Sequence, residues 1–184
     1  MKVAYRADID GLRAVAVCGV IIYHAEPVIA GRQLLPGGFL GVDVFFVISG
    51  FLITSILDAE LRSTGRLSIG HFYERRVRRL LPALLLVMLA SAPPAWFLLL
   101  PTQLKDYAQS ALYSLFFSSN FYWYLSLQEY GAESALLRPL LHTWTLAVEE
   151  QFYLLYPLFL LSAHRWAKHR ALLLTALILG SLWL

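Results

Sequence analysis

The stretch from residue 37 to residue 57, GGFLGVDVFFVISGFLITSIL, decides the fold class of this 184-residue chain. It has the length of about 20 apolar residues that a helix needs to cross a bilayer, and Asp43 is its one charged residue. The whole chain shares this bias, with 59% hydrophobic residues, 15% charged residues and a mean hydropathy of +0.62. Soluble domains carry about a quarter charged residues, so the sequence predicts an all-α membrane protein.

Further apolar runs on both sides of this stretch predict a polytopic transmembrane helix bundle of about five spans. The predicted spans are 12–29, 37–57, 80–100, 140–161 and 171–184. Another stretch, 106–125, is aromatic but interrupted by polar residues, so it either lies along the interface or forms a sixth span. The run 171–184 is shorter than a span, so we expect residues 1–184 to be the N-terminal part of a larger bundle.

Basic residues favour one orientation of this bundle, because short cytoplasmic loops hold the excess of Lys and Arg. With five spans and a cytoplasmic N-terminus, only Arg32, Lys105 and Arg138 of the 15 Lys and Arg residues fall outside. A sixth span weakens this bias, so five spans are favoured. The basic residues line the membrane side and no nucleic-acid-binding module is present, so no nucleic acid partner is predicted. The single cysteine, Cys18, excludes a cysteine-based zinc cage, and no metal site is predicted.

Ionisable side chains inside predicted spans are the first functional candidates, because a charge in lipid is costly. Arg13 and His24 lie eleven positions apart, on one helical face and about 16 Å apart along the axis. Histidine takes and returns a proton near neutral pH. A long ligand with its charged end at Arg13 would therefore present its reactive end to His24. The alternative is a histidine that only bonds a neighbouring helix.

The second predicted span adds an acid beside glycines. Gly37 and Gly38 would allow another backbone or a ligand to approach closely. Asp43 is expected to reach a depth similar to that of His24 and to orient its ring. The alternative is an aspartate in the headgroup zone, or one that caps a helix.

An arginine-rich segment precedes the third predicted span, within an expected loop over residues 58–79. Its plain role is a topology signal that meets anionic lipid head groups. Arg76 and Arg79 also share a helical face and could clamp a phosphorylated ligand, because arginine binds phosphate bidentately.

Two adjacent acids, Glu149 and Glu150, lie in the predicted span 140–161. Adjacent residues on a helix point about 100° apart, so both cannot face one site. We predict that Glu149 faces the bundle, because it lies four residues after Thr145 on the same helical face.

Four stretches of the sequence, in this order, resemble the signature blocks of acyltransferase family 3, a family of integral-membrane O-acyltransferases. They are YRADIDGLRAVAVCGVIIYHA (5–25), GGFLGVDVFFVISGFLIT (37–54), FYERRVRRLLPALLL (72–86) and LLHTWTLAVEEQFYLLYP (140–157). The family pattern of an arginine, ten residues and a histidine matches Arg13 and His24. Its Arg-x-x-Arg pair, its di-glycine and the acid of its second span match Arg76 and Arg79, Gly37 and Gly38, and Asp43, respectively.

The resemblance implies transfer of an acyl group, often acetyl, from cytoplasmic acyl-coenzyme A to a hydroxyl of a cell-envelope glycan, such as lipopolysaccharide O-antigen or peptidoglycan. It places the chain in a bacterial inner membrane, with membrane lipid around it. Acyl-coenzyme A is then a donor substrate, and no permanently bound cofactor is expected. His24 would act as a general base or carry the acyl group, with Asp43 and Glu149 as polar partners. Arg13, Arg76 and Arg79 would bind the donor.

The full family domain has about ten helices, and the opening stretch YRADIDGLRA and the block PLLHTWTLAVEEQFY most resemble the branch with an additional C-terminal periplasmic SGNH-type domain. We therefore expect a further segment or partner to supply the missing helices or that domain. Two other functions stay open at this point. One is an inactive or partner-dependent membrane fragment, and the other is a fragment of a proton-coupled transporter.

Overall fold

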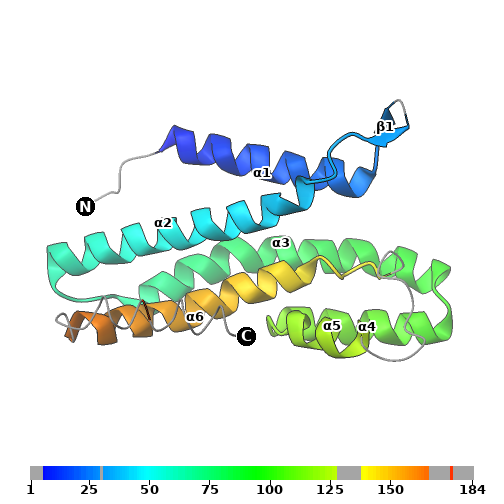
Figure 1. The fold of residues 1–184 in the computed structure, drawn as a ribbon. Helices are drawn as coiled ribbons and strands as arrows, with labels where there is room; N and C mark the ends of the chain where they lie inside the picture. Colours follow the sequence, from blue (N-terminus) through cyan, green and yellow to red (C-terminus); the bar gives the residue numbers. More distant parts are fainter. Residues whose placement is uncertain (1–5, 30, 128–137, 166–174, 176–184) are drawn as a thin grey trace. The chain divides into compact units, whose positions relative to one another are not determined.

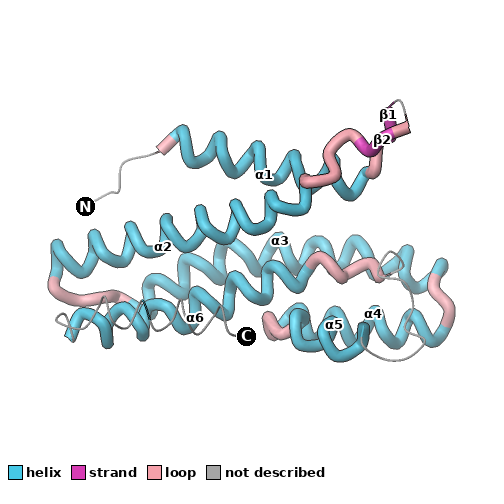
Figure 2. The backbone as a smooth tube through the Cα atoms, in the orientation of Figure 1, coloured by secondary structure: helices cyan, strands magenta, loops and turns pink. Residues whose placement is uncertain are grey.

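The computed structural model describes residues 6–29, 31–127, 138–165 and 175 (Figure 1). They fall into two compact units, unit 1 over residues 1–67 and unit 2 over residues 68–184. The described residues of both units are predominantly helical, as predicted, apart from one pair of two-residue strands in unit 1 (Figure 2).

Unit 1 is a pair of antiparallel helices, α1 (Ala7–Ala25) and α2 (Gly41–Thr64). The connection holds an antiparallel strand pair, β1 (Val28–Ile29) and β2 (Arg32–Gln33), and then a short 3-10 helix, η1 (Gly38–Leu40). The first helix therefore ends four residues before the predicted span does. The second helix extends seven residues past the predicted end.

Glycines in the GGFLG segment allow the two helices of unit 1 to touch. A Cβ on Gly38 would overlap the carbonyl oxygen of Gly19, and a Cβ on Gly41 would overlap that of Ala16. Small residues permit this kind of backbone approach between membrane helices. At Gly37 the described part of the chain offers no atom within 4 Å of such a Cβ. The close approach therefore lies at Gly38 and Gly41, and Gly37 takes no part in it.

Unit 2 contains α3 (Ile69–Leu98), α4 (Pro101–Leu115), α5 (Ser119–Leu127) and α6 (Thr143–Arg165). Helix α4 packs on α3, while α4 and α5 both pack on α6 (Figure 1). The turn between α4 and α5 contains Phe117 with a positive φ of 50°. The stretch 106–125 is therefore a helical hairpin. The whole helices that form it, α4 and α5, are about 22 Å and 14 Å long, each shorter than the ~30 Å core of a bilayer.

The prediction of a loop over residues 58–79 is wrong, because only 65–68 lie outside helices. Gly65 ends α2 with a φ of 68°, a conformation that suits glycine. Ion pairs one turn apart support helix on both sides, Arg62 with Asp58 at 2.7 Å and Arg78 with Glu74 at 2.8 Å. The arginines before the third predicted span are thus presented by a helix.

Two helices in the described part of the chain are long and apolar enough to cross a membrane, Gly38–Thr64 and Ile69–Leu98. Only 22% and 17% of their apolar windows are buried, so most of this apolar surface needs lipid or further protein to cover it. The number of spans stays a prediction. The predicted span 171–184 lies outside the described residues except for residue 175.

Hydrogen bonds between side chains of different helices hold the hairpin of unit 2 against α6. Ser114 of α4 and Thr143 of α6 are buried and share a hydrogen bond of 2.7 Å. Gln151 of α6 donates to the carbonyl of Phe117 at 2.8 Å and exchanges hydrogen bonds with Asn120 of α5 at 2.9 and 3.2 Å. Gln151 therefore holds the turn between α4 and α5 against α6.

Candidate active site

Helix α1 carries two of the predicted site residues on one unbroken helix. Arg13 is half-buried, and its guanidinium carbon lies 5.0 Å from the ring centroid of Phe45 on α2. His24 is exposed in the last turn of α1, and its ring meets that of Tyr23 edge-on with centroids 5.3 Å apart. The eleven-residue spacing sets the two about 16 Å apart along the axis. Arg13 is thus anchored against α2, while His24 is open to an incoming group.

The structure does not bring Asp43 to His24. The packed pairs Gly19 with Gly38 and Arg13 with Phe45 fix the register of α1 against α2, and this register sets Asp43 level with Ala14. His24 lies ten residues further along α1, about 15 Å away along the axis. The expectation that the two reach a similar depth therefore fails. Asp43 is exposed in the first turn of α2, near the level of Arg13.

Arg76 of α3 lies against an aromatic ring of α6 in unit 2. Its guanidinium carbon is 4.2 Å from the ring centroid of Tyr153, and 5.7 Å from that of Phe72 one turn earlier on α3. This is a cation–π arrangement, in which the ring face attracts the cation. Arg79, predicted to act with Arg76, is exposed. Arg76 and Arg79 lie on the same helix, and Arg76 is the one that packs against an aromatic ring of α6.

The adjacent acids of α6 have different surroundings. Glu149 accepts a short hydrogen bond from the Tyr153 hydroxyl one turn later. Glu150 has a buried Oε1 with no hydrogen-bond partner in the described part of the chain. Its carboxylate also interacts electrostatically with Arg76. Both acids therefore belong to the surroundings of Arg76. Glu149 binds the hydroxyl of the ring on which Arg76 rests, and Glu150 lies near enough to Arg76 to interact with it electrostatically.

Sequence reasoning missed Tyr153 and passed over Glu150. The available signal was the spacing of Glu149 and Tyr153 at i and i+4, which stacks two side chains on one helical face. A second signal was the pair of aromatic residues before the arginines in FYERR. Neither signal says which ring an arginine of a different helix will meet, because that depends on how α3 and α6 pack.

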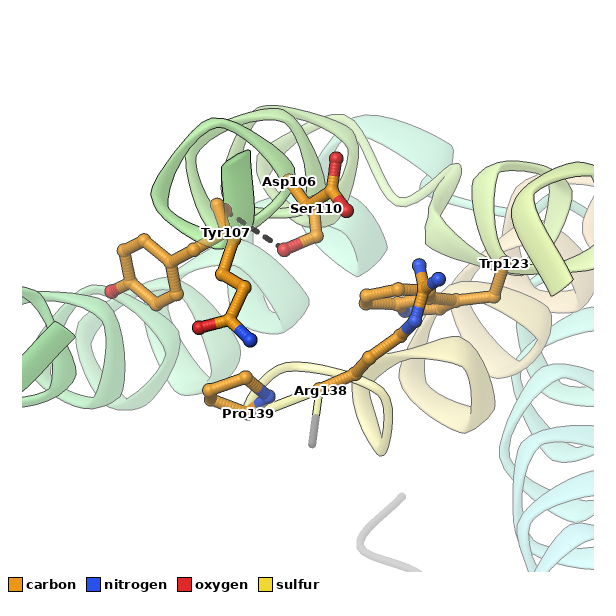
Figure 3. Close-up of a pocket in the computed structure, with 7 residues that line it drawn as sticks. Asp106, Tyr107, Ser110, Trp123, Arg138 and Pro139 are labelled. Atoms are coloured by element: carbon orange, nitrogen blue, oxygen red, sulfur yellow. Dashed lines mark hydrogen bonds between the residues drawn. The ribbon is translucent and has the colours of Figure 1, made fainter. Parts of the chain in front are cut away.

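A small cleft lies beside the α4–α5 hairpin (Figure 3). Its volume is about 10 Å³, room for about one water molecule, and its lining residues are Gln103, Asp106, Tyr107, Ser110, Trp123, Arg138 and Pro139. The guanidinium of Arg138 lies 5.4 Å from the Trp123 ring centroid, and Arg138 also donates to Ser126 at 3.4 Å. The Nε atom of Arg138 and the indole nitrogen of Trp123 are buried without hydrogen-bond partners among the described residues. Two donors thus face a polar space, where water would satisfy them.

No group of three or more His, Cys, Asp or Glu side chains that could hold a metal ion occurs within residues 6–29, 31–127 and 138–165. The described residues offer guanidinium groups, carboxylates and the exposed imidazoles of His24, His71 and His142. A guanidinium can bind a phosphorylated anion, and an imidazole can transfer a proton.

Helices that need a lipid environment define the class of a membrane-embedded helical protein, with an exposed histidine at the end of α1 in unit 1 and an arginine held against an aromatic ring in unit 2. The family model described as "Acyltransferase domain" matches residues 6–184. The chain belongs to this acyltransferase family, as its sequence motifs predicted.

Curated relatives agree with this assignment. The O-acetyltransferase OatA of Staphylococcus aureus strain NCTC 8325 is 43% identical over 154 residues, which cover 84% of this chain and 24% of the relative. A provisionally named O-acetyltransferase of S. aureus strain MSSA476 is 43% identical over 161 residues, 88% of this chain and 26% of the relative. The chain thus spans about a quarter of the length of these relatives. No solved structure matched it.

Proposed function

We propose that this chain forms part of a membrane O-acetyltransferase that moves an acetyl group from cytoplasmic acetyl-coenzyme A to a hydroxyl of a cell-envelope glycan, such as O-antigen or peptidoglycan. The observation that carries the proposal is the acyltransferase family match along residues 6–184. The names of the staphylococcal relatives support acetyl as the group transferred.

In this proposal the arginines bind the donor. Arg76 has the best-defined position, and its planar guanidinium suits the bidentate binding of a phosphate of coenzyme A. Arg79, one turn away on an exposed face, would add a second contact as the donor arrives. Arg13 would guide the donor along α1 toward His24, and the carboxylate of Asp43 would lie near the level of Arg13.

His24 is the proposed catalytic residue. Acting as a general base, its imidazole takes the proton of the acceptor hydroxyl while the hydroxyl oxygen attacks the thioester carbonyl carbon. The C–S bond then breaks, and the coenzyme A thiolate leaves and takes up a proton. Alternatively, the imidazole attacks the thioester first and passes the acetyl group to the acceptor. The exposure of His24 supports both routes, since either needs contact with an incoming group.

The proposed cellular setting follows from the same chemistry. Acetyl-coenzyme A is cytoplasmic, so we place the N-terminus of α1 and the arginines of α3 on the cytoplasmic side of a bacterial inner membrane. Envelope glycans lie beyond that membrane, so we propose that a further segment or partner, such as an SGNH-type domain, receives or passes on the acetyl group.

Substitutions at the native gene test this function, because the host then supplies any further segment or partner. Transfer of radiolabelled acetyl from acetyl-coenzyme A to envelope glycan is measured in isolated membranes. We expect His24→Ala to abolish transfer while the protein still inserts, and His71→Ala, an exposed histidine of α3, to leave it unchanged. Retained transfer by His24→Ala would remove His24 from the mechanism. Proton flux without any acetyl transfer would favour a transporter.

A further inference from the structure

Four arginines crowd the start of α3, and Arg76 differs from the other three. Arg75, Arg78 and Arg79 are exposed, whereas Arg76 is half-buried. Arg78 forms an exposed ion pair with Glu74 at 2.8 Å, of the kind that holds a side chain only weakly. Arg76 instead packs on a ring that belongs to another helix. Its position therefore depends on the tertiary structure of unit 2.

That ring is itself held in place by burial and by a hydrogen bond. Tyr153 is only 3% exposed, and its hydroxyl donates to Glu149 one turn back on α6. The next residue, Leu154, accepts a hydrogen bond of 2.8 Å from the hydroxyl of Tyr73, which ties α3 to α6 at this level. The Tyr153 ring is thus a rigid surface beneath Arg76.

A nearby acid leaves the donor groups of Arg76 open. Glu150 of α6 is near enough to Arg76 to interact with it electrostatically, but no ion pair joins the two within the described residues. The guanidinium therefore rests on the ring face of Tyr153, and among these residues no carboxylate pairs with its N–H groups. Donor groups in a fixed and open arrangement suit a phosphate, because the entropy of ordering the arginine has already been lost.

From this geometry we infer that Tyr153 is a positioning residue for the acyl donor, whose ring face fixes the Arg76 guanidinium so that it can receive a phosphate of coenzyme A. The inference rests on the proposed function, in which Arg76 binds that donor. Tyr153 acts through Arg76 and touches no reacting atom. Its loss should therefore weaken donor binding and spare the chemical step at His24 on unit 1.

The test measures KM for acetyl-coenzyme A and kcat in membranes from hosts that carry substitutions at the native gene. We expect Tyr153→Leu to raise KM about tenfold, the effect of losing a desolvated cation–π contact, with kcat within about twofold of wild type. Tyr153→Phe keeps the ring face and should leave KM unchanged. Phe121→Leu is the control, because Phe121 is an exposed ring of α5 in the same unit.

A double substitution separates positioning from general damage to the fold. In an Arg76→Ala background, Tyr153→Leu should raise KM no further, whereas a loss of packing alone would still add its own effect. If Tyr153→Leu reduces the amount of protein in the membrane, Tyr153→Met, a flexible apolar side chain that fills gaps, carries the same test.

Two results would overturn the inference. One is an unchanged KM in Tyr153→Leu or Tyr153→Met while Arg76→Ala raises KM. The other is a KM raised equally by Tyr153→Phe and Tyr153→Leu, which would assign the effect to the hydroxyl. An unchanged KM in Arg76→Ala is a separate outcome, because it would remove Arg76 from donor binding and refute the proposed function at that residue.

Discussion

The two units of this protein hold their helices together by opposite means. In unit 1, α1 and α2 approach until the backbone at Gly38 and Gly41 meets the carbonyls of α1, with no side chain between them. In unit 2, polar side chains such as Gln151 and Ser114 reach from one helix to the next. Close packing needs small residues, and polar ties need matched partners. In unit 1 the close approach therefore depends on the missing side chains of Gly38 and Gly41, with the contact of Arg13 and Phe45 beside it, whereas unit 2 depends on hydrogen bonds of side chains.

The proposed site residues follow the same division. His24 in unit 1 is exposed and has freedom to meet a reacting group. Arg76 in unit 2 is held against Tyr153, as a residue that binds part of a ligand should be. The comparison predicts that added side-chain atoms in unit 1 will lower the free energy of unfolding most. The loss of a hydrogen-bonding side chain in unit 2 should lower it by a smaller amount.

The largest expected effect is that of Gly38→Ala. The new Cβ would overlap the Gly19 carbonyl oxygen, and backbone atoms cannot give way cheaply. We expect the free energy of unfolding to fall by about 2–3 kcal/mol, the upper part of the usual range of about 1–3 kcal/mol for overpacking, as measured by SDS titration of the protein in micelles. Gly37→Ala is the matched control and should cost little, because its Cβ meets no described atom within 4 Å. Equal losses in both variants would contradict the close approach.

A smaller loss is expected from Gln151→Leu, which removes the ties between α6 and the tip of the hairpin. Interhelical hydrogen bonds in membranes are worth about 0.6–1.7 kcal/mol each, so we expect a loss of about 1–2 kcal/mol in the same titration. Gln109→Leu is the control, because Gln109 is exposed on α4.

The hydrogen bonds between Gln151 and Asn120 also predict that the two residues are energetically coupled. In a double-mutant cycle, Asn120→Leu should add little once Gln151 is lost, since both substitutions break the same pair. Strict additivity would mean that these hydrogen bonds do not hold the hairpin in the membrane.

The smallest expected effect concerns the exposed pair before the first predicted span. The Arg6 guanidinium hydrogen-bonds the Asp8 carboxylate at 2.9 and 2.6 Å and lowers its pKa from 3.8 to about 2. In Arg6→Ala the pKa of Asp8 should return toward its ordinary value, as followed by carboxyl carbon NMR. Because the folded-state pKa is depressed, any stabilisation is present above the ordinary pKa and is lost as pH falls toward 2. No effect at neutral pH is expected from so exposed a pair.

Much of this architecture could be predicted from local patterns in the sequence. Apolar runs predicted the helices, and the arginine spacing of α3 and the Arg13–His24 spacing of α1 depend only on the 3.6-residue turn. Glycine clusters predicted a close approach, but not that Gly38 makes it and Gly37 does not. The loop expected over 58–79 failed because charged residues at one-turn spacing also stabilise helices.

The sequence by itself determined that this chain is a helical membrane protein of the acyltransferase family, because hydropathy and motif spacing are properties of neighbouring residues. Only the tertiary structure decided which residues meet across helices. It set Asp43 level with Ala14 instead of His24, and it chose Tyr153 as the surface for Arg76. Such contacts depend on the register and rotation of one helix against another. Packing of whole surfaces fixes both, and no local pattern encodes them.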